Sequence, residues 1–521
     1  MNISAVLSIV RRDYKEDVDK KRNFKNIRRF FDKSKKGEYT LDDQTWNDLD
    51  MDKVYEKLDR NYSSPGEASL YSILRNPVAE VEKLNHRDNV ITALKTNSDL
   101  RERLQCIFYK LGRDPKNTFL DMMESELVVN KLKYFLYTFI GKVCPIIAAI
   151  LIILFGEDYV IGLLVLSSLN IFINFRERDT IKSRGIIYLR SIIKAAKEIT
   201  SIKSEDIKEY SNKISLNIDH ARDIDRNTVL IGFVNMWSGL FEFISTIFLI
   251  EECAYYKISS VLKEKKKYIL NIFDTVGELE ALLSIAGYQN NLKRPYIKPR
   301  FIKDAALNIK QGIHPLIENP VANSARIKNK GIVLTGTNMS GKSTFLRMLG
   351  VNILLAQTFN FALAKDYEAG FFNIVTSISP NDDLTKGKSY YMAEAESILR
   401  IVRAMDKELP VFCPIDEIFR GTNPIERIAM SAEILSYLNN EKNISIVATH
   451  DRELADILKD TYDFYYFSED VDNKKGLSFD YKLKPGVSQT RNAIRLLEYI
   501  GYPKQITDKA YKRAKTIEGF I

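Results

Sequence analysis

The chain has 521 residues, a formal net charge of +9 and four scattered cysteines without a C-x-x-C pair. The cysteine pattern argues against a disulfide framework and against a thiolate metal site, and the length allows two or more domains with cores of their own. The positive charge favours a polyanionic partner, either nucleic acid or anionic lipid headgroups, although a basic soluble protein without such a partner has the same composition.

The N-terminal segment, residues 1–45, is predicted to be helical and basic. Its lysines and arginines are interrupted by Asp and Glu, a mixture that is typical of a solvated helix face; a binding role is the alternative. The apolar start of the chain is short and its charges follow rather than precede it, so we expect no cleavable signal.

Two strongly apolar segments follow, at residues 134–155 (YFLYTFIGKVCPIIAAILIILF) and 159–175 (YVIGLLVLSSLNIFINF). As helices they would extend roughly 33 and 25 Å, against a bilayer core of about 30 Å. Lys142 would cost about 2.5–3.5 kcal/mol at the bilayer midplane and less if its ammonium group reached the surface. The sequence therefore predicts a transmembrane hairpin over residues 131–180, with a hairpin buried in a large soluble core as the alternative.

The charges around the hairpin give it an orientation. The turn between its two helices carries Glu157 and Asp158, whereas the flanks are basic. The flanking basic residues are Lys131, Lys133, Arg176, Arg178, Lys182 and Arg184. By the positive-inside rule, both ends of the hairpin face the cytoplasm.

Residues 331–344, GIVLTGTNMSGKST, contain an apolar strand followed by the spacing G-x-x-x-x-G-K-[ST] of a phosphate-binding loop. Gly336 and Gly341 let the backbone curl so that its N–H groups point at phosphate oxygens. Lys342 can then reach the β- and γ-phosphates, and Ser343 offers a hydroxyl to Mg²⁺. A glycine turn before an ordinary helix is the alternative, but the order of strand, loop and helix favours a nucleotide site.

Two further segments carry residues that such a site needs. Residues 410–417, PVFCPIDE, form an apolar run that ends in Asp416 and Glu417, although its proline removes a ladder donor from a central strand. In a P-loop ATPase, Asp416 would hold the Mg²⁺ shell and Glu417 would polarise the attacking water. Residues 444–448 are another strand candidate, and His450 behind it is either a γ-phosphate sensor or an ordinary loop histidine.

These motifs together closely resemble the ATPase domain of MutS proteins. Residues 335–344 (TGTNMSGKST), 416–422 (DEIFRGT) and 448–450 (ATH) are similar to its loop, acid and histidine motifs. Residues 382–394 (DDLTKGKSYYMAE) resemble the MutS form of the ABC signature. Residues 481–486 and 497–503 resemble the C-terminal strand and helix. Thr337 and Ser340 depart from the usual proline and small residue, and neither change removes a phosphate contact.

The resemblance implies an ATPase that uses ATP and Mg²⁺ and works as a homodimer, in which Ser389 caps the γ-phosphate bound by the opposite subunit. Lys342, Glu417 and His450 would be catalytic, and Ser343 and Asp416 would hold the Mg²⁺. The nucleotide would contact the whole loop, which comprises Gly336, Thr337, Asn338, Met339, Ser340, Gly341, Lys342, Ser343 and Thr344.

The N-terminal half resembles the helical core of MutS proteins more weakly. The similar segments are residues 46–115, with LDRNYSSPG at 58–66, and residues 277–287, GELEALLSIAG. The resemblance implies that residues 46–130 and 181–300 are two parts of this core, and that the hairpin lies where relatives insert a DNA clamp. Because both parts belong to one intracellular body, an even number of crossings separates them. Residues 229–250, a third apolar stretch, are therefore interpreted as a buried or interface-lying helix, with a further membrane span as the alternative.

The expected fold is α + α/β: a long-helix core with a transmembrane hairpin, then an ABC-type P-loop ATPase domain over residues 301–521 with a mainly parallel sheet. Two functions follow. The first is a membrane-tethered ATPase at the cell membrane, with its ATPase domain in the cytoplasm, that binds double-stranded DNA in mismatch repair or recombination. The second acts on a membrane or protein partner and has lost DNA binding. An ABC exporter is disfavoured, since the membrane part is too small for a transport path.

Overall fold

The computed structural model describes residues 3–16, 20–34, 36–124, 130–183, 185–224, 240–337, 340–378, 390–419, 422–439, 442–472, 476–487 and 493–517. The chain forms two compact units. The helical unit comprises Met1–Lys35, Leu58–Ser72 and Asn89–Asn291, and the sheet unit comprises Lys36–Lys57, Ile73–Asp88 and Leu292–Ile521. Residues 46–130, which we expected to be one part of the helical core, thus contribute to both units, and the expected domain boundaries stay predictions.

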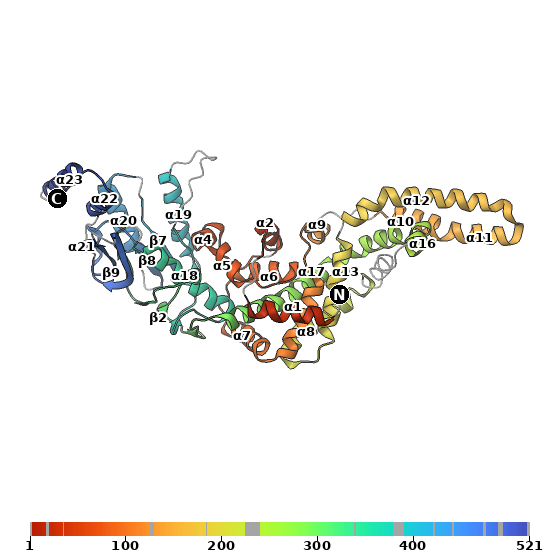
Figure 1. Cartoon of the computed structure of the whole chain (residues 1–521), viewed down its shortest axis with the longest axis horizontal. Helices are drawn as coiled ribbons and strands as arrows, with labels where there is room; N and C mark the ends of the chain where they lie inside the picture. The colour runs from red at the N-terminus through yellow and green to blue at the C-terminus, as the bar shows by residue number, and fades with distance from the viewer. Residues whose placement is uncertain are drawn as a thin grey trace. The chain divides into compact units, whose positions relative to one another are not determined.

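A helix of 42 residues, α17 (Ile250–Asn291), is the longest element of the helical unit (Figure 1). At about 1.5 Å per residue it extends about 63 Å. Its buried residues Ile269, Ile272, Val276 and Leu279 recur every three or four positions, which is the period of one apolar helix face. Helices from distant parts of the chain cover that face, namely α1 (Ile3–Lys15), α8 (Ser98–Leu111), α13 (Ile186–Thr200) and α14 (Lys208–His220). Shorter helices complete the unit: α2 (Phe24–Ile27), α3 (Arg29–Lys33), α9 (Thr118–Glu124) and most of α6 (Ser64–Arg75).

Glu280 of α17 fixes the start of α6 against the long helix. Its carboxylate accepts hydrogen bonds from the backbone N–H groups of Tyr62 (2.5 Å) and Ser63 (3.1 Å) and from the Ser63 hydroxyl. Donors of this kind are the unpaired N–H groups at a helix N-terminus. Complete burial nevertheless raises the pKa of Glu280 to about 7. One turn earlier in α17, Gly277 lies so close to the carbonyl of Pro65 that no side chain would fit.

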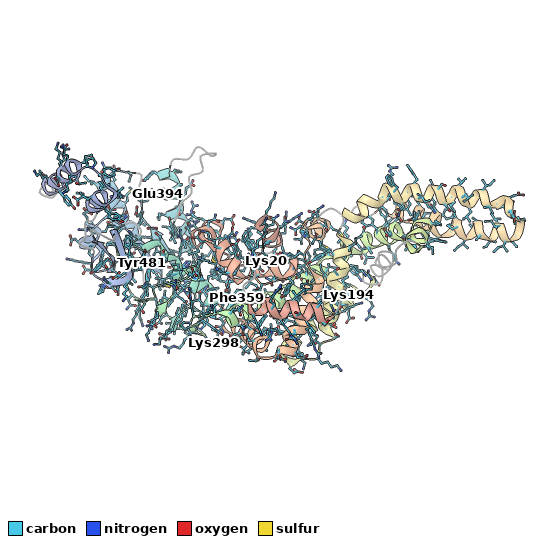
Figure 2. All side chains as sticks on the ribbon, in the orientation of Figure 1. Lys20, Lys194, Lys298, Phe359, Glu394 and Tyr481 are labelled. Carbon is cyan, nitrogen blue, oxygen red and sulfur yellow. The ribbon has the colours of Figure 1, made fainter. Side chains whose placement is uncertain are left out.

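The apolar segments form a helical hairpin that projects from the helical unit. Its first arm consists of α10 (Lys131–Thr138), a π-helical turn (Phe139–Val143) and α11 (Cys144–Phe155). A short turn (Glu157–Tyr159) leads to the second arm, α12 (Val160–Ser183), which runs antiparallel beside the first (Figure 1). Figure 2 shows side chains pointing outward along both arms.

Both arms have the length and composition of a membrane span. The mean hydropathy is 2.4 for Lys131–Phe155 and 1.6 for Glu157–Glu177, and only 11% and 6% of their most apolar windows are buried. Large apolar side chains such as Ile153, Phe155 and Phe175 are strongly exposed. The hairpin is therefore not enclosed by a core within the described part of the chain, contrary to the alternative of a buried hairpin.

The sheet unit is built on a six-stranded sheet with the order β10-β9-β4-β8-β7-β6. Its strands are β4 (Gly331–Thr335), β6 (Asn373–Ile374), β7 (Val411–Asp416), β8 (Ile444–Ala448), β9 (Tyr462–Asp472) and β10 (Gly476–Pro485). Strand β4 pairs in parallel with β8 and β9, β8 pairs in parallel with β7, and β7 with β6; β10 is antiparallel to β9. The carboxyl ends of β4, β7 and β8 therefore lie at one edge of the sheet.

Helices flank this sheet, and β4, β7 and β8 are buried throughout. The helices are α18 (Lys342–Phe359), α19 (Tyr390–Ala404), α20 (Pro424–Leu438), α21 (Leu454–Leu458), α22 (Ala493–Ile500) and α23 (Lys504–Ile517). A cluster that includes Val333, Val411, Ile415, Leu435 and Val447 fills the space between sheet and helices. Strands that carry apolar residues on both faces are typical of a sheet covered on both sides.

A second sheet of four strands, with the order β1-β5-β2-β3, joins the same unit. Its strands are β1 (Arg300–Phe301), β2 (Ala306–Gly312), β3 (Asn323–Lys328) and β5 (Asp366–Ala369). Strand β2 is antiparallel to both β3 and β5, whereas β1 and β5 are parallel. The unit therefore contains mixed sheets, and the sequence did not predict this second one.

Two N-terminal segments of the chain also build the sheet unit. Ile73–Asp88 holds the start of α7 (Val81–Thr96), and Lys36–Lys57 holds α4 (Asp43–Asp48) and all but the last residue of α5 (Met51–Leu58). The buried carboxylate of Asp48 accepts hydrogen bonds from the Thr376 hydroxyl (2.7 Å) and the Ile378 N–H (2.9 Å), just beyond β6. The Asp48 carbonyl accepts another from Arg347 of α18 (2.7 Å). The segment Lys36–Lys57 therefore braces the loops around the carboxyl edge of the six-stranded sheet.

Candidate nucleotide-binding site

The loop between β4 and α18 is bounded by two glycines with positive φ. The φ angle is 137° at Gly336 and 109° at Gly341, a region in which residues with a side chain are strained. Helix α18 begins directly behind the second glycine, at Lys342. Because the first N–H groups of a helix lack intrahelical partners, they are free to bind an anion held in this loop.

Lys342 lies inside the loop that it follows. Its side chain is buried, and its ammonium group donates to the carbonyl oxygens of Gly336 (2.6 Å) and Thr337 (3.0 Å). A buried ammonium group needs acceptors, and these two carbonyls supply them. The lysine is thereby fixed at the mouth of a cavity, where the phosphate oxygens of a ligand could also accept hydrogen bonds from its ammonium group.

Ser343 and Asp416 meet at the carboxyl edge of the sheet. The Ser343 hydroxyl donates to the Asp416 carboxylate at 2.5 Å, although one residue opens α18 and the other ends β7. Mg²⁺ prefers oxygen ligands and is commonly bound by one or two protein oxygens together with phosphates. This pair has the donor chemistry for such an ion. Within the described ranges, no cluster of three or more His, Cys, Asp or Glu residues is present that could hold a metal without a ligand's help.

Glu417 and His450 form the next pair along the same edge. Glu417 has a positive φ of 58°, and its backbone N–H donates to the carbonyl of Ala448 at 2.9 Å. The Glu417 carboxylate lies 3.1 Å from Nε2 of His450. The residue after the histidine, Asp451, is held by Arg427 of α20 through two hydrogen bonds, of 2.5 and 2.9 Å.

The Arg427–Asp451 pair is a two-point, charge-assisted contact, the strong kind of ion pair. The carboxylate of Asp451 raises the pKa of the Arg427 guanidinium, so the pair stays charged over the whole working range. Since Asp451 directly follows His450, this contact holds the segment that presents the imidazole to Glu417.

A cavity of about 1030 Å³ opens beside the loop and lies wholly within the sheet unit. Six groups of residues line it: the loop and the start of α18, the acid pair, the end of β2, the segment that leads from β2 to the start of β3, Ile378 beyond β6, and aromatic residues of β9 and β10. Tyr481 of β10, labelled in Figure 2, is one of these aromatic residues, and its ring lies close above Gly341. Asn323 fixes that strand by accepting from the Leu483 N–H and donating to the Tyr481 carbonyl, both at 2.9 Å.

His314 adds a polar group to the wall of the cavity. Its Nδ1 accepts a hydrogen bond from the Leu316 N–H at 3.2 Å, so the neutral ring carries its proton on Nε2. Burial disfavours the charged imidazolium, and Arg347 adds repulsion, so the pKa of His314 falls to about 4. Nε2 is buried and has no partner among the residues that the structure describes. His314 therefore borders the cavity as a neutral imidazole.

The structure brings most of the predicted site residues together. Thr337, Gly341, Lys342, Ser343, Thr344, Asp416 and Glu417 all line the cavity. Gly336 and the buried Ser340 belong to the loop behind it, and His450 reaches the site through Glu417. Asn338, Met339 and Ser389 lie outside the described residues.

Sequence reasoning missed other parts of the lining, namely Gly312, Ile317, Asn319, Pro320, Val321, Asn323, Phe345, Met348, Ile378 and Phe467. A sequence signal that could have found this wall is the His314-Pro315 dipeptide between β2 and β3. The remaining residues belong to a loop and to helix and strand faces whose sequence carries no motif.

A phosphate-binding loop between a parallel strand and a helix, with an acid pair at the end of a nearby strand, defines a P-loop nucleotide-binding domain. Residues 332–518 match the family model of MutS domain V. This domain is therefore similar to the ATPase domain of MutS proteins.

Similar proteins are the DNA mismatch repair proteins MutS of three bacteria. That of Halothermothrix orenii is 28% identical over 277 residues, covering 51% of this chain and 30% of the relative. That of Thermus thermophilus is 29% identical over 239 residues, covering 45% and 29%. That of Listeria monocytogenes serotype 4a is 29% identical over 274 residues, covering 50% and 31%. The chain thus spans about a third of the length of these relatives.

Proposed function

We propose that this protein is a Mg²⁺-dependent ATPase that binds ATP in the cavity beside Gly341. One observation carries the proposal: the loop lysine, the Ser343–Asp416 pair and the Glu417–His450 pair converge on the carboxyl edge of one sheet. Lys342 would bind the terminal phosphates, and Ser343 and Asp416 would hold Mg²⁺. Bound Mg²⁺ would neutralise charge that develops on the phosphate oxygens.

Glu417 would polarise the attacking water, and His450 would hold the carboxylate in place. A carboxylate acts as a base only if it reaches the water within hydrogen-bond distance. The 3.1 Å contact with His450 restricts the Glu417 side chain to one side of its strand end and is the support for this division of roles.

The ATPase would work as a homodimer, with Ser389 completing the site of the opposite subunit. Two observations support this. Residues 382–394 resemble the ABC signature, and residues 332–518 match the family model of MutS domain V. A site that is completed in trans couples nucleotide binding to the approach of two subunits, and this would be the motion that ATP drives.

The hairpin would tether the protein to the cell membrane, with the sheet unit in the cytoplasm. Its exposed apolar arms are long enough to cross a bilayer core of about 30 Å. An apolar surface of this size on a soluble monomer would need a cover, and lipid supplies one for both arms at once. The basic residues on both flanks support an orientation with the two ends on the same, cytoplasmic side.

ATP turnover would be coupled to double-stranded DNA, as in a protein of mismatch repair or recombination. The support is the function that the relatives are named for, DNA mismatch repair, and the net charge of +9. The second candidate is an ATPase that acts on a membrane or protein partner without DNA. The exposed hairpin favours this second candidate, because the hairpin occupies the part of the chain where we expect relatives to carry a DNA clamp.

Binding of the detergent-solubilised protein to duplex, mismatched and branched DNA at several salt concentrations separates the two candidates. Phosphate contacts make affinity fall with salt, with a slope of about −0.9 per contact. A steep slope that changes between ATP and ADP supports coupling to DNA. Binding that is absent at low salt, while ATP turnover persists, supports the second candidate.

A further inference from the structure

Helix α12 carries a polar stripe inside its apolar span. The stripe consists of Asn170, Asn174 and Glu177, whose spacing of four and three positions places them on one helix face. Asn170 is fully buried and Glu177 nearly so. Apolar side chains such as Val165 and Phe172 are exposed on the other side. The helix therefore has one face toward the protein and one without a protein partner among the described residues.

The stripe holds a turn between two helices, which we name the α16–α17 elbow (residues 244–252). It comprises the end of α16 (Leu240–Ile247) and the start of α17. The Asn170 amide donates to the Ile247 carbonyl at 2.6 Å, and the Asn174 amide donates to the Glu252 carboxylate at 2.8 Å. Figure 1 shows α16 beside the part of α12 that is nearer to the rest of the helical unit.

Further along α12, toward its C-terminal end, Glu177 as the third member of the stripe connects the hairpin to α17. The Glu177 carboxylate accepts from the Lys133 ammonium (2.8 Å), the Tyr137 hydroxyl (2.9 Å) and the Tyr256 hydroxyl (2.8 Å). These residues come from both arms of the hairpin and from α17. The cluster is polar, charged and close to the basic flanks, and it therefore defines the level at which the apolar part of the hairpin begins.

The elbow lies on the apolar side of that level. Asn170 precedes Glu177 by seven positions, which is about 10 Å along a helix. On the other arm, Gly141 lies against the backbone of Phe248, so closely that a side chain at this position would collide with its carbonyl. The exposed Lys142 beside it has a long stem, along which its ammonium group can extend toward a polar surface.

The bond from Asn170 to Ile247 has a particular meaning at this depth. Ile247 ends α16, and the last carbonyls of a helix have no intrahelical partner. In water such a carbonyl is solvated, whereas in hydrocarbon it must find a donor within the protein. A fully buried asparagine that donates to it, from within an apolar span, satisfies this requirement. Leu249, with φ of 48°, then turns the chain back into α17.

We propose that the α16–α17 elbow is a third membrane-embedded element, which enters the lipid beside the hairpin and turns back without crossing. The inference rests on the proposed membrane tether and goes beyond it. Its partner is the acyl-chain region of the bilayer, which the outward side chain of Ile244, 37% exposed, would contact. An element that enters and leaves on one side preserves an even number of crossings.

The test uses the full chain in vesicles of palmitoyl-oleoyl phosphatidylcholine and phosphatidylglycerol. With the four native cysteines replaced, a nitroxide label is attached at Ile244→Cys, at Ile150→Cys on α11, or at Lys267→Cys on α17. Depth is measured from the relative relaxation of each label by oxygen and by a water-soluble nickel complex. We expect the labels at 244 and 150 to respond mainly to oxygen and the label at 267 mainly to nickel.

The outcomes separate the inference from the tether. A lipid signal at 150 with a water signal at 244 overturns the embedded elbow while the tether stands. Water signals at both positions overturn the tether and the elbow together. Asn170→Leu should move the label at 244 toward water, because the Ile247 carbonyl then seeks solvent. Ser168→Leu is the matched control, since its exposed hydroxyl donates to the Leu164 carbonyl of the same helix (2.9 Å), and it should leave the signal unchanged.

Discussion

Glu417 and His450 lie 3.1 Å apart, from carboxylate oxygen to Nε2, at the ends of two neighbouring strands. The register of β7 and β8 pairs Asp416 with Ala448, which places the residues that follow on the same edge of the sheet. The contact is thus a consequence of parallel pairing. Its second support is Arg427, which holds Asp451 next to the histidine.

The first prediction concerns the base. Glu417→Gln should lower kcat for ATP hydrolysis by roughly 100-fold or more, because a glutamine amide cannot accept the proton of the attacking water. ATP affinity should stay close to that of the wild type, since Ser343 and Asp416 are untouched. Steady-state phosphate release and nucleotide titration measure the two effects. Glu433→Gln, at an exposed position of α20, is the control and should change neither.

Lys342→Ala should act differently, by weakening nucleotide binding itself, since the ammonium group is expected to contact the phosphates.

Equal turnover in the wild type and in Glu417→Gln would contradict the role assigned to the Glu417 carboxylate.

The second prediction concerns Arg427. Arg427→Ala should lower kcat about tenfold, equivalent to about 1.4 kcal/mol, with little change in KM, because the guanidinium does not line the cavity and holds Asp451 next to His450. A merely structural loss would lower the melting temperature and raise KM as well. Lys310→Ala, which removes the exposed ion pair with Asp366 (2.7 Å) in the same unit, is the control.

A double-mutant cycle sharpens this test. If Arg427 acts through the histidine, adding Arg427→Ala to His450→Ala should cost almost nothing further. Additive losses would mean that the two residues act independently. Exchanging the pair, with Arg427→Asp and Asp451→Arg together, should recover part of the activity lost in either single variant.

Much of the site was predictable because phosphate chemistry requires particular residues at fixed spacing. The loop from Gly336 to Thr344 could be found from its glycines and lysine, and the acid pair from its place behind an apolar run. Pro414 argued against β7 as a central strand. The Pro414 carbonyl accepts a hydrogen bond from the Ser377 N–H, so the backbone of Pro414 faces the chain that follows β6. Strand β6 ends at Ile374. The N–H group that proline lacks would therefore point past the end of β6, where the structure can do without it.

What the sequence could not reveal was long-range packing. Asp48 reaches the loop behind β6 from a part of the chain that we assigned to the helical core, and a single buried aspartate carries no local signal of its distant partners. The same holds for Asn170: in the sequence it is a polar residue that interrupts an apolar segment, and only its hydrogen bond to the Ile247 carbonyl explains it. Residues 229–239 of the third apolar stretch lie outside the described residues, whereas its end forms α16 and the start of α17.

The third prediction concerns pH. The pKa of His314 is about 4 in the folded protein and about 6.5 in an unfolded chain. Between these values the unfolded chain binds a proton that the folded protein does not, so stability is fully present above pH 6.5 and falls as the pH drops toward 4. In urea unfolding followed from pH 7.5 to 4.5, His314→Gln should lose less stability than the wild type. An identical decline in both would show that the histidine is not buried in its neutral form.

The same substitution should also affect nucleotide binding. If Nε2–H donates to the bound nucleotide, His314→Gln should weaken ATP binding about threefold to tenfold, the range of one neutral hydrogen bond. The kcat value should change little, because His314 is assigned no part in activating the attacking water. Calorimetric titration with ATP at pH 7.5 measures the loss.

The fourth prediction concerns the dimer. Ser389→Arg and Lys342→Ala should each be inactive alone, since one blocks the contact made in trans and the other the phosphate contact made in cis. Mixed dimers contain one site in which both changes meet and one site with intact halves, so partial activity should return on mixing. If a demonstrated mixed dimer shows no recovery, the site is self-contained within one chain.

The last prediction concerns the hairpin, where many large apolar side chains are exposed. Its arms should carry the protein into the membrane fraction and resist extraction by alkaline carbonate, because spans of this hydropathy gain more from lipid than from water. In a cysteine-free background, Glu157→Cys at the tip should react with an impermeant thiol reagent in intact cells. Lys328→Cys, also at an exposed position but on β3 of the sheet unit, should react only after lysis, since the basic flanks keep both ends of the hairpin inside. A soluble protein with an unlabelled tip would mean that another protein surface covers the arms, and the place of the hairpin in the chain would then favour a DNA clamp.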